Sequence, residues 1–206
     1  MLEGLDDIDW HRLSHAYGEA SDVPNLIRDV VSPDQEQRDS ALQQLFATIW
    51  HQGTVYEATV HALPFLIDLL GVQDDQVPDA ELLPLLVASI LCGCGYAEVH
   101  CAQARINPFT RRPIPPPPDL DQRLAQERRV VAEVRRVGTR AVPLLVPYVK
   151  HPNADLRVAI ADAFSRYPAL SSLTAPCLRD ALAVESDETT REAMAAALAA
   201  LATGPA

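Results

Sequence analysis

Polar side chains that could bind or react gather in the stretch from Trp50 to His61, WHQGTVYEATVH. Glu57 and His61 are four residues apart, so on a helix that begins near Thr54 both would project from one face. That spacing suits a metal ligand pair or a hydrogen-bonded pair, although it is less specific than a His-Glu-x-x-His motif. Three hypotheses follow: a structural pair, a metal or catalytic site, or a partner-binding patch formed with Trp50, His51, Gln52 and Tyr56.

A second group of possible ligands is the pattern C-x-C-x5-H-C, formed by Cys92, Cys94, His100 and Cys101. Thiolates and imidazole are soft ligands for zinc, but the spacing fits no zinc finger or ribbon. Buried or incidental thiols are therefore favoured over a metal site. With Tyr96, His100 is also a candidate for the same binding surface as Tyr56.

Arginines are concentrated between Arg105 and Arg140, where nine arginines face four acidic residues. Arg111 and Arg112 lie in this region, and so does a helical stripe from Arg128 to Arg140. Such a stripe could contact phosphates. A solvated face that pairs with neighbouring acids is the alternative that we favour, and Arg111 and Arg112 are candidate partner contacts.

The elements that must position these residues are helices. Apolar residues recur with helical spacing through Ala41, Leu42, Leu45 and Phe46 and again beyond Val55, and no run shows sustained alternation with a period of two. Gly53 breaks the pattern, so the polar stretch is predicted to be the turn between two antiparallel helices. The fold class predicted is all-α.

The helices carry an internal repeat. An apolar-Pro-x-Leu motif is expected to open a helix at Pro24, Pro64, Pro143 and Pro176. In three places a capping residue also precedes an arginine by four positions, and an Ala-rich helix follows. These pairs are Asp34 with Arg38, Asn153 with Arg157, and Asp187 with Arg191. Each arginine is expected to pair with a cap carboxylate in its own or a neighbouring repeat.

These marks resemble HEAT repeats, the helical hairpins that stack into α-solenoids. The Pro of the first helix, the Asp or Asn of the turn and the Arg of the second helix carry the resemblance, best over 142–201 and less well over 23–70. The stretch WHQGTVYEAT is similar to bacterial HEAT-repeat proteins. The resemblance implies one domain over 1–206, with second helices lining a concave binding surface.

The stretch from about 71 to 140 departs from the repeat. We expect a helix over Val77–Leu91 and then an irregular Pro- and Arg-rich insertion at about 92–118, in which the four prolines Pro115–Pro118 are extended. Asp119 is then expected to cap a helix that continues to about Val137 and is stopped by Gly138.

Composition narrows the classes of partner. The chain has 206 residues and a net charge of −11, which disfavours a protein that coats nucleic acid or an anionic membrane surface. No apolar run reaches the length of a membrane span, and the first residues do not resemble a signal peptide. We therefore expect a soluble, cytoplasmic protein with reduced cysteines and no cofactor.

These observations together favour a non-enzymatic protein-binding module, a scaffold or adaptor or an immunity-type inhibitor, whose partner is neutral or basic. The alternative is a HEAT-like enzyme, either a DNA glycosylase or a metal-dependent hydrolase. A glycosylase of this kind combines a basic concave face with aromatic side chains that hold the base. This chain is acidic, and its tryptophans are Trp10 and Trp50.

Overall fold

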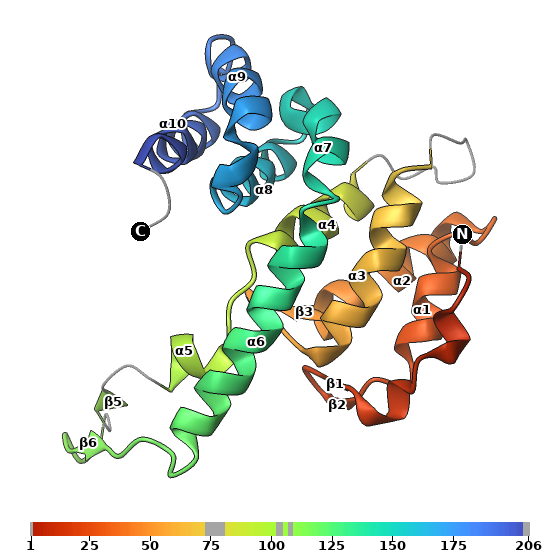
Figure 1. The fold of residues 1–206 in the computed structure, drawn as a ribbon, viewed down its shortest axis with the longest axis vertical. Coiled ribbons are helices and arrows are strands. Elements are labelled where there is room, and N and C mark those ends of the chain that lie inside the picture. The colour runs from red at the N-terminus through yellow and green to blue at the C-terminus, as the bar shows by residue number, and fades with distance from the viewer. Residues whose placement is uncertain (1, 73–80, 102–104, 107–108, 204–206) are drawn as a thin grey trace.

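The protein is mostly helical in the computed structural model, which describes residues 2–72, 81–101, 105–106 and 109–203 (Figure 1). Its α-helices are α1 (Val23–Asp29), α2 (Gln35–Thr48), α3 (Glu57–Leu70), α4 (Leu82–Leu91), α5 (Tyr96–His100), α6 (Leu120–Gly138), α7 (Val142–Leu145), α8 (Ala154–Ser165), α9 (Ser171–Leu182) and α10 (Glu188–Thr203). Short 3₁₀ helices add turns at Leu5–Asp7, Trp10–Arg12, Val146–Lys150 and Pro168–Leu170. No helix in the described part of the chain is both long enough and apolar enough to span a membrane.

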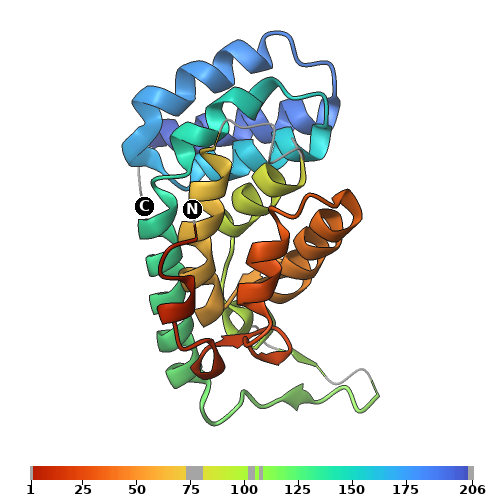
Figure 2. The same cartoon turned by 90° about the vertical axis from the view of Figure 1, so that its right-hand side faces the viewer.

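The helices lie against one another in a regular order. Figures 1 and 2 show α2, α4, α8 and α10 as successive neighbours, and α6 running alongside α3. Within the chain α1 packs on α2, α3 on α4, and α9 on α10, while α6 also touches α4 and α5. The buried apolar side chains form one continuous cluster that reaches from Leu5 to Leu201.

The prediction of a helical protein is confirmed, and the structure adds three antiparallel hairpins of two-residue strands. They pair β1 (Ser14–His15) with β2 (Gly18–Glu19), β3 (Trp50–His51) with β4 (Thr54–Val55), and β5 (Arg105–Ile106) with β6 (Pro113–Ile114). Strands this short are hidden from a search for alternating hydrophobicity, which needs a longer run.

The β3–β4 hairpin also corrects the start of the following helix. Gln52 and Gly53 have φ values of 50° and 89°, the left-handed backbone that a two-residue hairpin turn requires. The chain is therefore still extended at Thr54, and α3 begins at Glu57 instead of near Thr54. Glu57 and His61 still share one face of α3, because both lie within it.

The three predicted caps are confirmed. Each capping side chain accepts a hydrogen bond from a backbone N–H in the first turn of its helix, as an N-cap does. The bonds are Glu36 N to Asp34 Oδ1 at 2.9 Å, Leu156 N to Asn153 Oδ1 at 3.2 Å, and Thr190 N to Asp187 Oδ1 at 2.8 Å.

The arginine that follows each cap does not pair with a cap carboxylate, contrary to expectation. It folds back instead and donates to a backbone carbonyl six residues earlier, in the turn that precedes the helix. The three bonds are Arg38 to Ser32 O at 2.7 Å, Arg157 to His151 O at 2.7 Å, and Arg191 to Glu185 O at 3.0 Å. One contact therefore recurs at the same register in α2, α8 and α10.

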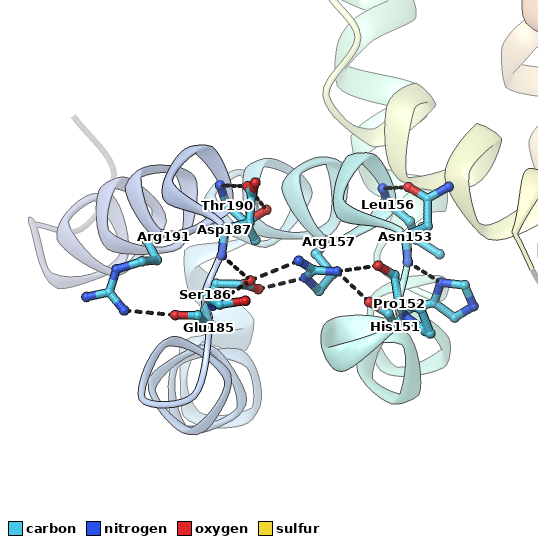
Figure 3. A network of polar contacts seen from close by, with 10 residues as sticks. All are labelled: His151, Pro152, Asn153, Leu156, Arg157, Glu185, Ser186, Asp187, Thr190 and Arg191. Carbon is cyan, nitrogen blue, oxygen red and sulfur yellow. Dashed lines mark hydrogen bonds and ion pairs between the residues drawn. The ribbon is translucent and has the colours of Figure 1, made fainter.

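Arg157 makes a further contact that connects two hairpins (Figure 3). Its Nε donates to Glu185 Oε2 at 2.7 Å and its NH2 group donates to Glu185 Oε1 at 2.9 Å. Only 11% of the Arg157 side chain and 6% of the Glu185 side chain are exposed. Because Glu185 lies in the turn between α9 and α10, this ion pair ties α8 to the next hairpin.

Two of the four proline motifs do not open a helix. Pro24 and Pro143 lie at the first positions of α1 and α7, but Pro64 and Pro176 lie inside α3 and α9. An interior proline removes one helical N–H. In α3 the neighbouring residues 62, 63, 65 and 66 are buried, so packing of the apolar face keeps the helix continuous across Pro64.

The start of α6 differs from expectation, whereas its end agrees with it. Asp119 is the residue before the helix, but its side chain pairs with Arg123 at 2.7 Å instead of capping the backbone. Gly138 is the last residue of the helix, so α6 ends there as predicted. Its lack of a side chain is required by packing, because an added Cβ would overlap with Leu91 Cδ2 and Tyr167 Oη.

The arginine stripe of α6 faces solvent and pairs in part with neighbouring acids, which is the interpretation that the sequence favoured. Arg128, Arg129 and Arg135 are exposed. Arg136 forms an ion pair with Glu133, and Arg140 donates to Asp68 of α3 at 2.7 Å.

The insertion at 92–118 is anchored where it leaves α4. Cys94 N donates to Gly53 O at 2.9 Å and Val55 N donates to Cys94 O at 3.1 Å, so the chain pairs with the β3–β4 hairpin. The four prolines lie outside any helix, as predicted, but Pro118 is part of a turn, so the predicted extended run does not reach it. The helix predicted from Val77 is described only from Leu82 onward, and residues 77–80 lie outside the described residues.

Candidate functional site

A hollow of about 250 Å³ lies where α3, α5 and α6 meet the first hairpin. It is lined by three residues that the sequence singled out, Tyr56, Glu57 and Tyr96. The remaining polar lining consists of Ser14 from β1 and of Arg123, Gln126 and Glu127 from α6. Segments far apart in the chain thus supply one cavity, which we call the Tyr56–Tyr96 hollow.

Tyr56 is positioned by the turn from β4 into α3. Its backbone N–H donates to Thr59 Oγ1 at 2.8 Å, and its phenol is 3.0 Å from Thr54 Oγ1. Thr59 is fully buried and its hydroxyl donates to the carbonyl of Ile49. Tyr56 is therefore the residue that precedes α3, with its phenol held by a threonine of the β3–β4 hairpin.

Glu57 is held by two neutral donors from opposite sides. Ser14 Oγ donates to Glu57 Oε2 at 3.1 Å, and Gln126 Nε2 donates to Glu57 Oε1 at 2.7 Å. These bonds connect α3 to β1 and to α6. They fix the carboxylate in the wall of the hollow without neutralising its charge.

Glu127 orients α5 and so determines where Tyr96 lies. Both carboxylate oxygens of Glu127 accept from the backbone N–H of Ala97, at 3.1 and 2.8 Å. The approach is close, because a Cβ added at Gly95 would lie 2.9 Å from Glu127 Cβ. Tyr96 follows Gly95 and is half-exposed, with its ring centroid 4.6 Å from that of His100.

The positive charge in the lining is already paired. Arg123 Nε donates to Asp119 Oδ2 at 2.7 Å. This bond lowers the pKa of Asp119 and raises the pKa of Arg123, so both groups are charged at neutral pH. Among the described ion pairs none involves Glu57 or Glu127. The three carboxylates Glu57, Asp119 and Glu127 therefore outnumber the one guanidinium, Arg123, and the region has a net negative charge.

The other residues predicted around the turn lie outside the hollow's lining. Trp50 packs edge-on against Phe46, with ring centroids 5.8 Å apart, and His51 packs against Tyr17 at 5.4 Å. Gln52 is exposed at the tip of the β3–β4 hairpin. The predicted turn is therefore divided between two surfaces, the hairpin tip and the hollow.

His61, Arg111 and Arg112 are also absent from the hollow's lining. His61 is exposed on α3, where it lies near Glu133 and helps Arg136 to lower the pKa of that carboxylate. Arg111 and Arg112 are exposed between β5 and β6, and Arg111 has a positive φ of 56°. The hydrogen-bond partners of Glu57 are Ser14 and Gln126, and His61 is not among them.

The cysteines do not gather into a ligand set. Cys94 Sγ donates to Gly53 O at 3.1 Å, and Cys92 Sγ lies 3.8 Å from Ala159 O. Burial raises the pKa of Cys92 to about 12, and burial also raises the pKa of Cys94. In the part of the chain that the structure describes, no three His, Cys, Asp or Glu side chains are placed to hold a metal ion.

Sequence reasoning missed Ser14, Arg123, Gln126 and Glu127. Ser14 lies in a two-residue strand without a local motif, and its contact with Glu57 spans 43 residues. Arg123, Gln126 and Glu127 lie on α6, where the sequence indicated only the arginine stripe from Arg128 to Arg140. One signal was present, because Gly95 before a short helix is where another side chain can approach the backbone closely.

Comparisons with known proteins give no family. No family model matches the chain, and no curated protein matches it. Among solved structures, a designed armadillo repeat protein, YIII(Dq)4CqI, is similar with 16% identity and a TM-score of 0.26, over 87% of this chain and 99% of that one.

Proposed function

We propose that this chain is a HEAT-like helical repeat protein that binds another protein, with the Tyr56–Tyr96 hollow as part of its contact surface. The repeated arginine contact in α2, α8 and α10 supports the array. So does the succession of α2, α4, α8 and α10, because a hairpin whose apolar face is not buried alone must stack on its neighbours.

The observation that carries the binding role is the convergence of Tyr56, Glu57 and Tyr96 on one hollow. Tyr is among the residue types that contribute most to binding at protein interfaces, particularly where it lies in a pocket that the partner covers. The hollow lies on the side formed by α3 and α6. The proposed surface therefore differs from the row of second helices that the HEAT resemblance implies.

The partner that fits this surface is a neutral or basic protein. The chain has a net charge of −11, and the hollow is net negative because Glu57 and Glu127 line it with one arginine, Arg123. Two roles agree with such a partner. An immunity-type inhibitor would form a tight complex with one basic protein, whereas an adaptor would hold two partners at once.

The test is a pull-down of the tagged protein from the lysate of its native cells, read by mass spectrometry, beside a Tyr96→Ala variant. Tyr96 is 49% exposed, so its loss should leave the helices intact, which circular dichroism checks. Phe109→Ala is the matched control, because Phe109 is 93% exposed and does not line the hollow. A partner that is lost with Tyr96→Ala and kept with Phe109→Ala supports the proposal.

The same partner bound equally by all three forms would contradict the hollow as the contact surface. The stoichiometry of the purified complex, measured by light scattering, then separates the two roles. A one-to-one complex fits the inhibitor, and a ternary complex fits the adaptor.

A further inference from the structure

We propose that the Tyr56–Tyr96 hollow receives the guanidinium group of an arginine side chain of the partner. This inference rests on the proposed function and names the chemistry of its contact. It follows from three properties of the hollow: its unbalanced charge, its two phenol rings, and the geometry of its carboxylate oxygens.

The charge favours a cation. Glu57 and Glu127 both line the hollow, and both are held by neutral donors, namely a hydroxyl, an amide and a backbone N–H. Arg123 also lines it, but Asp119 already engages that guanidinium. A cation entering the hollow would meet two carboxylates in a partly enclosed space, where charge attraction is stronger than in open water.

The rings favour a flat cation. Tyr56 and Tyr96 both line the hollow; His100 packs against the Tyr96 ring, but that side chain is still half-exposed, so part of the ring can contact a ligand. A guanidinium group stacks on aromatic faces. It is also more weakly hydrated than an ammonium group, so it gives up less hydration free energy when it enters the hollow. A hollow of about 250 Å³ has room for such a group.

The oxygens favour a forked donor. A carboxylate offers about four acceptor positions, and the described hydrogen bonds of Glu57 use one at each oxygen. Both oxygens of Glu57 can therefore accept a second bond. A guanidinium presents parallel N–H groups that match two oxygens of one carboxylate, whereas an ammonium acts as a point charge.

The experiment uses the full chain and three short peptides of known composition. The first is acetyl-Gly-Ser-Arg-Ser-Gly-amide, and in the others citrulline or lysine replaces the arginine. Citrulline keeps the shape of arginine but is neutral. Each peptide is titrated into ¹⁵N-labelled protein, and the backbone amide signals of Tyr56, Glu57, Tyr96 and Ala97 report on the hollow.

The expected result is a saturable shift of those signals with the arginine peptide. Binding of the citrulline peptide should be weaker by about tenfold or more, because the charge-assisted bonds are lost. Glu57→Gln should weaken binding of the arginine peptide by a similar factor. Glu98→Gln, which removes an exposed carboxylate of α5 that does not line the hollow, should leave its affinity unchanged.

Equal binding of the arginine and citrulline peptides would overturn the inference, and so would an affinity unaffected by Glu57→Gln in a protein whose spectrum shows it folded. A lysine peptide that binds as well as the arginine peptide would overturn the assignment to guanidinium. If the arginine peptide does not bind, but a partner is still lost with Tyr96→Ala, only this inference falls. If Tyr96→Ala keeps every partner, the hollow is not the contact surface, and this inference falls with it.

Discussion

Replacing Arg157 with methionine should destabilise the fold strongly, because its guanidinium is shared between two hairpins. It forms two hydrogen bonds with Glu185 and donates to the carbonyls of His151 and Pro152. Breaking a buried ion pair by removing one partner costs about 3–5 kcal/mol. Glu185 would keep bonds from the N–H groups of Ser186 and Asp187, so we expect the lower end, about 3 kcal/mol.

The matched control is Arg191→Met. Arg191 occupies the same position in α10 and donates to the carbonyl of Glu185, but it is exposed. An exposed polar contact of this kind contributes about 1 kcal/mol or less. The free energy of unfolding of each variant is measured by urea titration followed by circular dichroism. For a chain of this length, about 3 kcal/mol corresponds to a fall in Tm of about 6–12 °C.

A double variant separates the ion pair from the loss of packing. Arg157→Met with Glu185→Gln removes both charges, so it should be less destabilised than the sum of the two single variants. If Arg157→Met and Arg191→Met lower the free energy of unfolding by the same amount, the reasoning is refuted. Strictly additive single variants would refute it as well.

Three further predictions follow from individual residues. Hydrogen bonding to Arg157 lowers the pKa of Glu185 below its ordinary value of 4.5. The stability that this carboxylate contributes is therefore complete well above pH 4.5, and it is lost as the pH falls through the pKa of Glu185 in the folded protein. The difference in unfolding free energy between the protein and Glu185→Gln, measured by urea titration, should therefore shrink from pH 7 to pH 3.5; a constant difference would contradict it. Gly138→Ala should lower the unfolding free energy by about 1–3 kcal/mol, because the new methyl group overlaps with Leu91 and Tyr167, and thermal unfolding would show an unchanged Tm if that packing were looser. Cys92, with its pKa raised to about 12 by burial, should be the last of the four thiols modified by N-ethylmaleimide in a mass-spectrometric time course, and early modification would contradict its burial.

The helical part of the fold could be predicted because its signals are local. Asp34, Asn153 and Asp187 each cap the helix that follows them, so a few adjacent residues determine where the helix begins. The β3–β4 hairpin was missed because two-residue strands show no periodicity. Gly138 ends α6 as predicted, but its close packing against Leu91 and Tyr167 was missed because those residues are distant in sequence.

The candidate site was predictable only in part, for the same physical reason. Tyr56 and Glu57 lie in a dense polar stretch, and Tyr96 could be linked to them as another exposed tyrosine. Gln126 and Ser14 touch Glu57 across 69 and 43 residues, and no local pattern encodes those distances. Tertiary packing brings them together.

We expect residues 109–112, which precede β6, to accept an insertion without disturbing the packed helices. The excursion that carries them is fixed at one end by the pairing of Cys94 with the β3–β4 hairpin and at the other by Glu127, which holds α5. Between these anchors, residues 109–112 are exposed at the far end of the molecule from α9. This makes the position after Arg111 a suitable place to insert a fluorescent reporter or an affinity tag, with the hollow and the repeat contacts left as they are.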